Sequence, residues 1–255
     1  MLRTEFPHYQ HVDGWLHIGA LKFTSYFVDK FLSDAPFDSL EIGVHHGKFL
    51  IGIENLTPPN GRCIAVDVFS QQELNIDQSG FGSLEVFKSN YEKFCMNPER
   101  VIAMEEDSLN LDCQALGKGK FGIVSIDGGH TESHTVSDLQ AAQELVSDKG
   151  IVILDDILNQ DWMGVVSGAC SFFGSPLATR LAPFAVGFEK LFCCHFSIRA
   201  KVQQAIAADQ ALLRGIGIAP FKVTEFFGHK IISLQPFRRR ATTPRGSQAA
   251  GDQGA

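Results

Sequence analysis

Two acidic clusters follow apolar stretches of this sequence, and each stretch has the character of a buried strand. "FGIVSID" ends on Asp127, with His130 three positions later, and "GIVILDD" ends on Asp155 and Asp156. Carboxylates and imidazoles are side chains that bind cations and move protons near neutral pH. These residues therefore indicate a metal site, a catalytic site, or two ordinary loops that cap helices.

A glycine-containing turn carries a second group of polar residues. "LEIGVHHGKFL" places Glu41 before Gly43, and Gly47 opens the following helix. Glycine allows a tight turn and a close approach of the backbone to a ligand, although a turn without any ligand can need it as well. The pattern is E-x-G-x-x-x-G rather than the G-x-G-x-x-G of dinucleotide sites, which would have a glycine at His45.

Further polar residues end the next two expected strands. Asp67 lies about 20 residues after the glycine turn, where an acid can bind the two ribose hydroxyls of a nucleoside. Asp107 and Ser108 end the third strand and could meet the amino group and ring edge of an adenine. All three could instead cap a turn or the next helix.

Strands and helices alternate along the chain, which predicts a parallel, doubly wound α/β sheet. The expected strands are residues 38–44, 62–69, 100–108, 121–127, 150–156 and 190–198, followed by 221–235 as one strand or as a hairpin turning at Gly228. The expected helices are residues 15–33, 48–56, 84–96, 133–147 and 200–216, with a further helix after residue 160. Ligands bind beyond the carboxyl ends of the strands in such sheets. The acids at or near those ends are Glu41, Asp67, Asp107, Asp127, Asp155 and Asp156.

Composition limits the class of protein. The 255 residues are 44% hydrophobic and 20% charged, and the net charge of −7 argues against nucleic acid or an anionic membrane as the main partner. We expect one domain over residues 1–237, with residues 1–35 as a helical cap and residues 238–255 as a disordered tail. Six scattered cysteines, no apolar leader and no long apolar run predict a soluble, cytoplasmic protein.

Residues 38–160 resemble the cofactor half of class I S-adenosylmethionine-dependent methyltransferases. In that family the glycine turn lies along the methionine part of the cofactor, the acid after the second strand holds the ribose, and the loop after the third meets the adenine. The resemblance implies a Rossmann-like, doubly wound, seven-stranded, mostly parallel sheet with an antiparallel last strand, and S-adenosylmethionine as cofactor. It assigns cofactor binding to Glu41, Gly43, Gly47, Asp67, Asp107, Ser108 and Asp127.

The acidic clusters resemble those of metal-dependent O-methyltransferases, in particular the branch related to macrocin O-methyltransferase, and the layout is similar to that of catechol O-methyltransferase. The matching residues are Ile126, Asp127, Gly128, His130, Asp138, Leu139, Gly150, Asp155 and Asp156. The resemblance implies that Asp127, Asp155 and Asp156 bind the metal and that His130 stands in the position of the general base. Three converging carboxylates would repel one another, and Mg²⁺ or Mn²⁺ would relieve that repulsion. Glu132 departs from the branch, which often has an aromatic residue at this position.

These observations predict an O-methyltransferase that acts on the hydroxyl of a small molecule, such as a sugar or a natural-product scaffold. A metal-independent N- or O-methyltransferase and a non-catalytic S-adenosylmethionine-binding protein remain alternatives. His134 and His46 are the alternative bases, and residues 70–83 with residues 15–23 are the candidate substrate lid. Enzymes of this branch are often dimers or larger, which leaves a homo-oligomer open.

Overall fold

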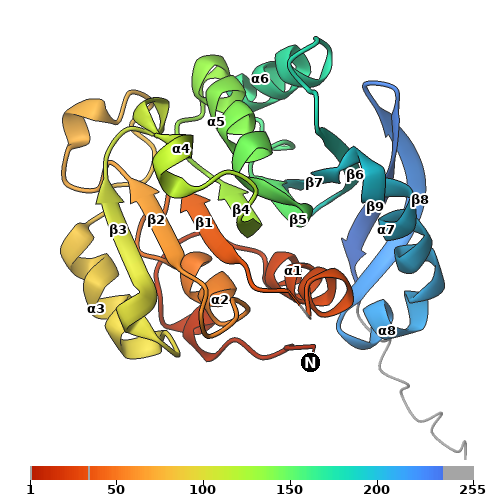
Figure 1. The fold of residues 1–255 in the computed structure, drawn as a ribbon, viewed down its shortest axis with the longest axis horizontal. Helices are drawn as coiled ribbons and strands as arrows, with labels where there is room; N and C mark the ends of the chain where they lie inside the picture. Colours follow the sequence, from red (N-terminus) through yellow and green to blue (C-terminus); the bar gives the residue numbers. More distant parts are fainter. Residues whose placement is uncertain (1, 34, 238–255) are drawn as a thin grey trace, which may run out of the picture.

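The computed structural model describes residues 2–33 and 35–237. The expected disordered tail, residues 238–255, lies outside the described residues. The described residues build one sheet with helices on both of its faces (Figure 1).

The sheet has nine strands in the order β3-β2-β1-β4-β5-β7-β6-β9-β8. The strands are β1 Asp38–Ile42, β2 Cys63–Asp67, β3 Val101–Glu105, β4 Phe121–Ile126, β5 Val146–Leu154, β6 Leu181–Gly187, β7 Lys190–His195, β8 Ile218–Phe226 and β9 His229–Pro236. Strands β1 to β5 are parallel to one another. Strand β7 runs antiparallel to β5 and β6, and β8 runs antiparallel to β9, so the antiparallel part is larger than one last strand.

The prediction of seven strands is wrong for two identifiable reasons. Strand β6 contains Pro183, and its pairing with β7 shifts register between Pro183 and Ala185, so the sequence there looks like an irregular connection. The last expected strand is a hairpin in which Gly228, at φ +72°, turns the chain between β8 and β9. The hairpin that the sequence left open is therefore the one that forms.

The helices are α1 Ile18–Phe31, α2 Leu50–Glu54, α3 Leu84–Phe94, α4 Cys113–Leu116, α5 Glu132–Leu145, α6 Met163–Phe173, α7 Phe196–Ala208 and α8 Gln210–Gly215, with short 3-10 helices η1 Pro7–Gln10, η2 Gln72–Leu74, η3 Pro98–Arg100 and η4 Ser108–Asn110. The helix expected over 200–216 is divided at Asp209, whose carboxylate accepts a hydrogen bond from Tyr26 and pairs with Lys30 of α1. The loop expected over 70–83 contains η2.

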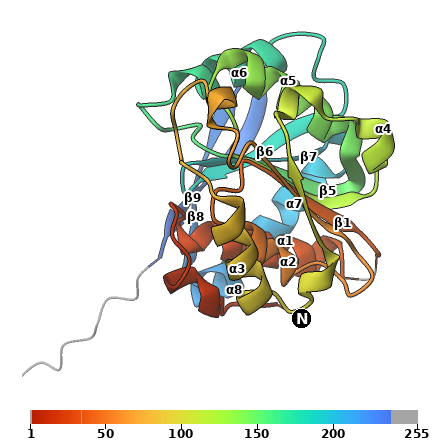
Figure 2. The same cartoon turned by 90° about the vertical axis from the view of Figure 1, so that its left-hand side faces the viewer.

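The two faces of the sheet carry separate apolar cores, because side chains alternate along each strand. Ile123 and Ile151 face the core that includes α1, α2, α3, α7 and α8, whereas Val124 and Val152 face the core that includes α4, α5 and α6. Figure 2 shows α4, α5 and α6 on one side of the sheet and α1, α2, α3 and α8 on the other. Strands β1, β2 and β4 and the second half of β5 are buried on both faces, as their apolar runs predict, whereas β3 at the edge of the sheet is partly exposed.

The parallel strands end together at one edge of the sheet, and the glycine turn closes onto it. Gly43 has φ +78°, and a Cβ at this position would lie 1.8 Å from the backbone oxygen of Asp127. Only glycine lets the end of β1 approach the end of β4 so closely. The two halves of the expected site therefore meet at this edge.

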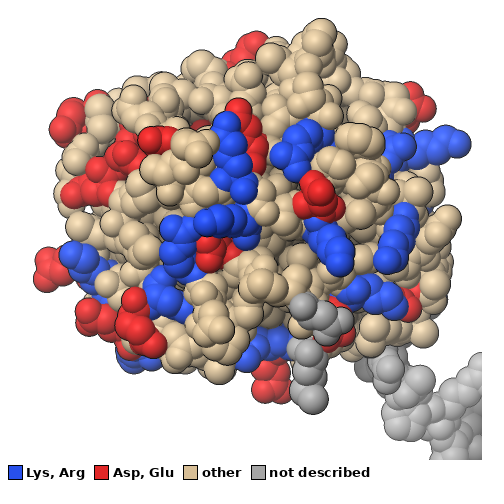
Figure 3. Space-filling model, in the orientation of Figure 1, with Lys and Arg blue, Asp and Glu red and all other residues tan. Residues whose placement is uncertain are grey.

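On the face drawn in Figure 3, positive and negative side chains are interspersed. Among the residues that the structure describes, no helix is long and apolar enough to cross a membrane.

Candidate active site

A cavity of about 480 Å³ opens at the carboxyl ends of the parallel strands. The predicted site residues that line it are Gly43, Asp67, Asp107, Ser108, Asp127, His130, Asp155 and Asp156. Glu41 and Gly47 do not line it. Most of the residues chosen from the sequence thus share one concave surface, of the size that small-molecule sites usually have.

Asp67 holds the glycine turn in place. Its Oδ2 accepts hydrogen bonds from the backbone N–H groups of Val44 and His45, both at 2.7 Å, and its Oδ1 accepts one from the N–H of Phe69 at 2.6 Å. Burial raises the pKa of Asp67 above its ordinary value, although these backbone hydrogen bonds oppose that rise. The carboxylate of Asp67, which is at the predicted ribose position, is therefore held by three backbone N–H groups. The same hydrogen bonds fix the conformation of the glycine turn.

Glu41 and Gly47 lie behind the cavity wall. Gly47 has φ +89°, and a Cβ there would be 2.8 Å from the ring of Phe87, so this glycine is needed for packing against α3. Glu41 is 2% exposed, and its Oε2 has no hydrogen-bond partner. Burial, followed by the charge of Asp127, raises the pKa of Glu41 well above its ordinary value.

Asp107, Ser108 and His134 form another part of the cavity wall. Asp107 caps η4, because its Oδ1 accepts a hydrogen bond from the N–H of Leu109 at 2.9 Å. The same oxygen lies 3.5 Å from Nε2 of His134, whose Nδ1 contacts the hydroxyl of Thr131 at 2.7 Å. Asp107 thus caps η4 and also lines the cavity. His134 lies beside Asp107 and not among the acids after β5.

Asp127, His130 and Asp156 bring their potential ligand atoms within 4.8 Å of one another. Nε2 of His130 is 3.1 Å from Oδ2 of Asp156 and 3.9 Å from Oδ1 of Asp127. Asp156 has φ +57°, and its Oδ1 accepts a hydrogen bond from the side chain of Asn159 at 2.9 Å. The turn after β5 therefore directs the second aspartate of the pair toward the residues that follow β4.

His130 is fixed on three sides. Asp77, in the loop after β2, accepts the backbone N–H of His130 at 2.6 Å and contacts its Nδ1 at 2.8 Å. The indole of Trp162 stacks on the imidazole, with ring centroids 4.4 Å apart. Burial lowers the pKa of His130, but hydrogen bonds to Asp127, Asp156 and Asp77 outweigh burial and raise it to about 11.

Asp155, which the resemblance implies to be a metal ligand, has a lysine as its partner in the structure. Lys190, the first residue of β7, donates a hydrogen bond from Nζ to Oδ2 of Asp155. Oδ1 of Asp155 accepts the backbone N–H of Asp156 at 2.8 Å. Burial, and then the charge of Asp127, raises the pKa of Asp155 above its ordinary value, and Lys190 opposes that rise. Two of the three predicted metal ligands, Asp127 and Asp156, thus lie in one cluster with His130. The third, Asp155, forms an ion pair with Lys190.

Comparison with known proteins agrees with this arrangement of fold and cavity. Residues 40–157 match the Methyltransf_24 family model, which describes a methyltransferase domain. Together with the fold, this match supports an S-adenosylmethionine-dependent methyltransferase. No curated protein matches the sequence.

Solved structures share the fold of this methyltransferase domain. The O-methyltransferase NovP is 16% identical with a TM-score of 0.54, over 70% of this chain and 80% of that chain. An O-methyltransferase from Bacillus cereus, in complex with SAH, is 16% identical with a TM-score of 0.52, over 72% of this chain and 84% of that chain. At these identities the likeness shows the class I methyltransferase fold.

Sequence reasoning about the methyltransferase domain missed Asp77, Trp162 and Lys190. Asp77 lies in a polar loop, Trp162 in the connection that leads into α6, and neither position has a pattern that predicts a contact with His130. Lys190 carried the clearer signal, because it is a charged residue at the start of the apolar run "KLFCC". His46, an alternative base, does not line the cavity, whereas His134 does.

Proposed function

We propose that this protein transfers the methyl group of S-adenosylmethionine to a hydroxyl oxygen of a small molecule. The observation that carries the proposal is the single cavity that contains both the glycine turn with Asp67 and the cluster of Asp127, His130 and Asp156. The first part suits a nucleoside cofactor, and the second suits the activation of a hydroxyl. Their common cavity allows the two reactants to be held in line for displacement.

The cofactor would lie across the ends of β1, β2 and β3. The backbone after Gly43 would follow its methionine part, Asp67 would face the ribose, and Asp107 with Ser108 would meet the adenine. Three backbone hydrogen bonds hold the carboxylate of Asp67 in a fixed place, which supports a binding role. Glu41 and Gly47 do not line the cavity, so they would support this region from behind rather than contact the cofactor.

The donor set at the ends of β4 and β5 fits a divalent cation. Two carboxylates and an imidazole lie close enough to share one ion, and Mn²⁺ accepts both oxygen and imidazole ligands, whereas Mg²⁺ prefers oxygen. Asp127 and Asp156 would hold the ion. When bound, it would supply positive charge that lowers the pKa of a substrate hydroxyl.

His130 is the proposed general base. Asp77 accepts from the Nδ1 side of the imidazole, so Nε2 is directed toward Asp127 and Asp156. Stacking on Trp162 limits rotation of the ring. A histidine held in this way presents one nitrogen to a hydroxyl bound beside the carboxylates, which is the geometry that proton transfer needs. The carboxylates raise the pKa of His130 to about 11, so it would serve as a base only when a cation held by Asp127 and Asp156 offsets their charge.

The acceptor is proposed to be a sugar or another hydroxylated natural-product scaffold. The cavity wall combines the rings of Trp15, Trp162 and Phe188 with many carboxylates, and such walls suit the faces and hydroxyls of a polar ring. Trp15 is 81% exposed at the mouth, and Asp77 fastens the loop after β2 over the acids. Both segments proposed as a lid therefore contribute to this cavity.

Metal-independent methyl transfer is the second candidate, and a specific observation favours it. The ammonium of Lys190 already neutralises one carboxylate of the acidic edge. With His130 between two other aspartates, the acids could remain together without an added ion.

Calorimetry and a chelator test separate these possibilities. We expect the purified protein to bind S-adenosylmethionine, to methylate members of a panel of sugars and phenols, to lose turnover in EDTA, and to recover it with Mn²⁺ or Mg²⁺. The absence of cofactor binding would refute the whole proposal. Unchanged turnover in EDTA would favour the metal-independent reaction.

A further inference from the structure

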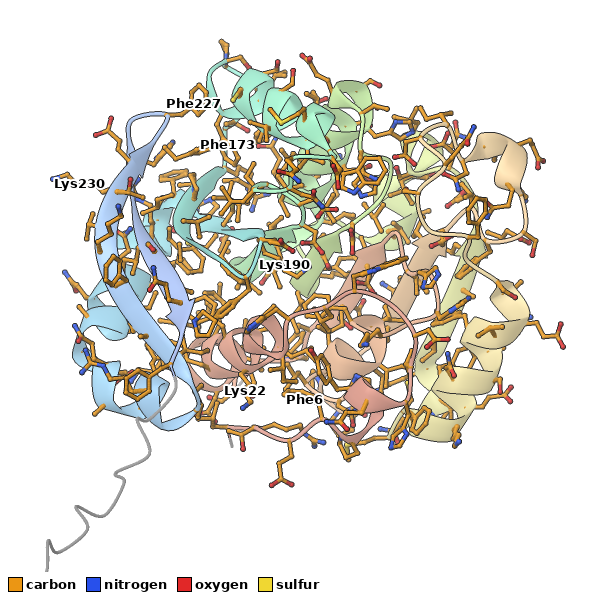
Figure 4. All side chains as sticks on the ribbon, turned by 180° about the vertical axis from the view of Figure 1, so that it is seen from behind. Phe6, Lys22, Phe173, Lys190, Phe227 and Lys230 are labelled. Atoms are coloured by element: carbon orange, nitrogen blue, oxygen red, sulfur yellow. The ribbon has the colours of Figure 1, made fainter. Side chains whose placement is uncertain are left out.

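Lys190 is an unusual lysine for a soluble protein. Its side chain is 2% exposed, although lysine is almost never fully buried without a charged partner. Figure 4 places it near the centre of the molecule, whereas Lys230 lies at the edge. The turn before β7 produces this position, because Phe188 and Glu189 both have positive φ and reverse the chain just before Lys190.

The ammonium group of Lys190 lies among acids. Nζ donates to Oδ2 of Asp155 and lies 5.3 Å from the centre of the Phe49 ring. Burial alone would lower the pKa of Lys190, but Asp155, then Asp127 and Glu41, raise it above its ordinary value. Glu41 is itself buried with an unpartnered oxygen. A permanent positive charge at this point therefore stabilises several buried carboxylates at once.

Both oxygens of Asp155 are engaged by the protein. Oδ2 accepts from Lys190, and Oδ1 accepts the backbone N–H of Asp156. Among the described residues, the group whose ligand atoms lie within 4.8 Å of one another comprises Asp127, His130 and Asp156, and it leaves Asp155 out. An ion at this edge would have to displace an ammonium group to gain the third aspartate.

We infer that Lys190 is a built-in cation that occupies Asp155, so that a divalent ion is held by Asp127 and Asp156 without Asp155. The inference rests on the proposed function, and it differs from the three-aspartate set that the sequence resemblance implies. Lys190 thereby sets both the charge of the site and the number of carboxylates that an ion can reach. It is a positioning residue, because it acts through Asp155.

The test compares the affinity of the full chain for Mn²⁺, by titration calorimetry, in three proteins. Lys190→Met frees Asp155 and removes a positive charge, so we expect Mn²⁺ to bind about tenfold more tightly, or more, than to the wild type. Lys190→Met/Asp155→Asn removes the whole ion pair without changing the net charge. We expect this double variant to bind Mn²⁺ within about threefold of the wild type, because neither side chain is a ligand.

The double variant decides between the two ligand sets. A loss of about tenfold or more in its Mn²⁺ affinity would show that Asp155 is a ligand and would overturn the inference. Unchanged affinity in Lys190→Met, or no Mn²⁺ binding by any of the three proteins, would overturn it as well. The double variant removes both members of the Lys190–Asp155 ion pair together, so it remains informative if Lys190→Met fails to fold.

Two controls keep this result separate from the proposed function. Lys230→Met removes an exposed lysine and should leave the Mn²⁺ affinity unchanged. S-adenosylmethionine binding, measured on the same samples, tests the methyltransferase proposal by itself. Retained cofactor binding with a lost Mn²⁺ site in the double variant would contradict the role of Lys190 and leave the proposed methyl transfer standing.

Discussion

At the residue scale, the site depends on pairs that hold each reactive group in one orientation. His130 is positioned by Asp77 and Trp162, and Asp155 by Lys190. Histidine residues that look alike in the sequence therefore have different places in the structure. His130 faces two aspartates, whereas His134 contacts Asp107 on another part of the cavity wall.

Replacement of the two histidines tests this difference. We expect His130→Ala to lower kcat by about 100-fold or more while the Kd for S-adenosylmethionine stays within about threefold, because a general base acts on the hydroxyl and not on the cofactor. His134→Ala, the matched control, should retain kcat within several-fold. Steady-state kinetics and calorimetry provide both numbers. If His130→Ala instead abolishes Mn²⁺ binding, His130 is a metal ligand and another group takes the proton.

At the scale of elements, the site exists because strand ends meet and because one turn is tight. Gly43 closes the end of β1 onto the end of β4, and Asp67 at the end of β2 fastens that turn through backbone N–H groups. The loop after β2 then crosses to β4 through the contact between Asp77 and His130. Asp67 and His130 are thus both held by segments other than their own.

Gly43→Ala tests the role of the turn. The added Cβ would collide with the backbone oxygen of Asp127 at 1.8 Å, and φ +78° is unfavourable for alanine. We expect a loss of about 2 kcal/mol or more in the free energy of unfolding, together with much weaker S-adenosylmethionine binding. Gly215→Ala is the control, since a Cβ there meets nothing within 4 Å. Equal urea unfolding curves for the two variants would contradict this account of the turn.

At the scale of the whole molecule, two apolar cores hold the sheet, and they also enclose several acids. Asp138 of α5 is 1% exposed, and the side chain of Ser108 favours its charged form. Burial raises the pKa of Asp138 from 3.8 to about 7. The folded protein therefore keeps a proton on Asp138 at pH values where the unfolded chain has released it, so this group makes folding less favourable as the pH rises from about 4 to 7.

Asp138→Asn should remove this pH dependence. The free energy of unfolding of the variant relative to the wild type should increase between pH 4.5 and pH 7, by at most about 4 kcal/mol, and then remain constant. Urea unfolding at several pH values measures the difference. Glu85→Gln, which changes an exposed acid at the start of α3, should show no such trend. A constant difference between Asp138→Asn and the wild type across this pH range would contradict the prediction.

The sequence by itself indicated the parallel strands and the side chains at their ends. Apolar runs such as "FGIVSID" favour strands buried on both faces, and the carboxyl ends of parallel strands share one edge. The cavity residues Asp67, Asp127, His130 and Asp156 follow from that rule. Cys193 and Cys194 lie on opposite faces of the sheet, because side chains along a strand alternate with a period of two residues.

Only the tertiary structure decided the number of strands and the partners of the acids. Strand β6 could not be predicted from the sequence because it contains Pro183, and a proline in a strand is tolerated only where pairing is irregular. His130 is 53 residues from Asp77, and Lys190 is 35 residues from Asp155. Contacts over such separations depend on where a loop and a turn return the chain, and no local pattern encodes that. The sequence therefore placed the acids at one edge, and the folded chain decided which of them remain available to bind a ligand.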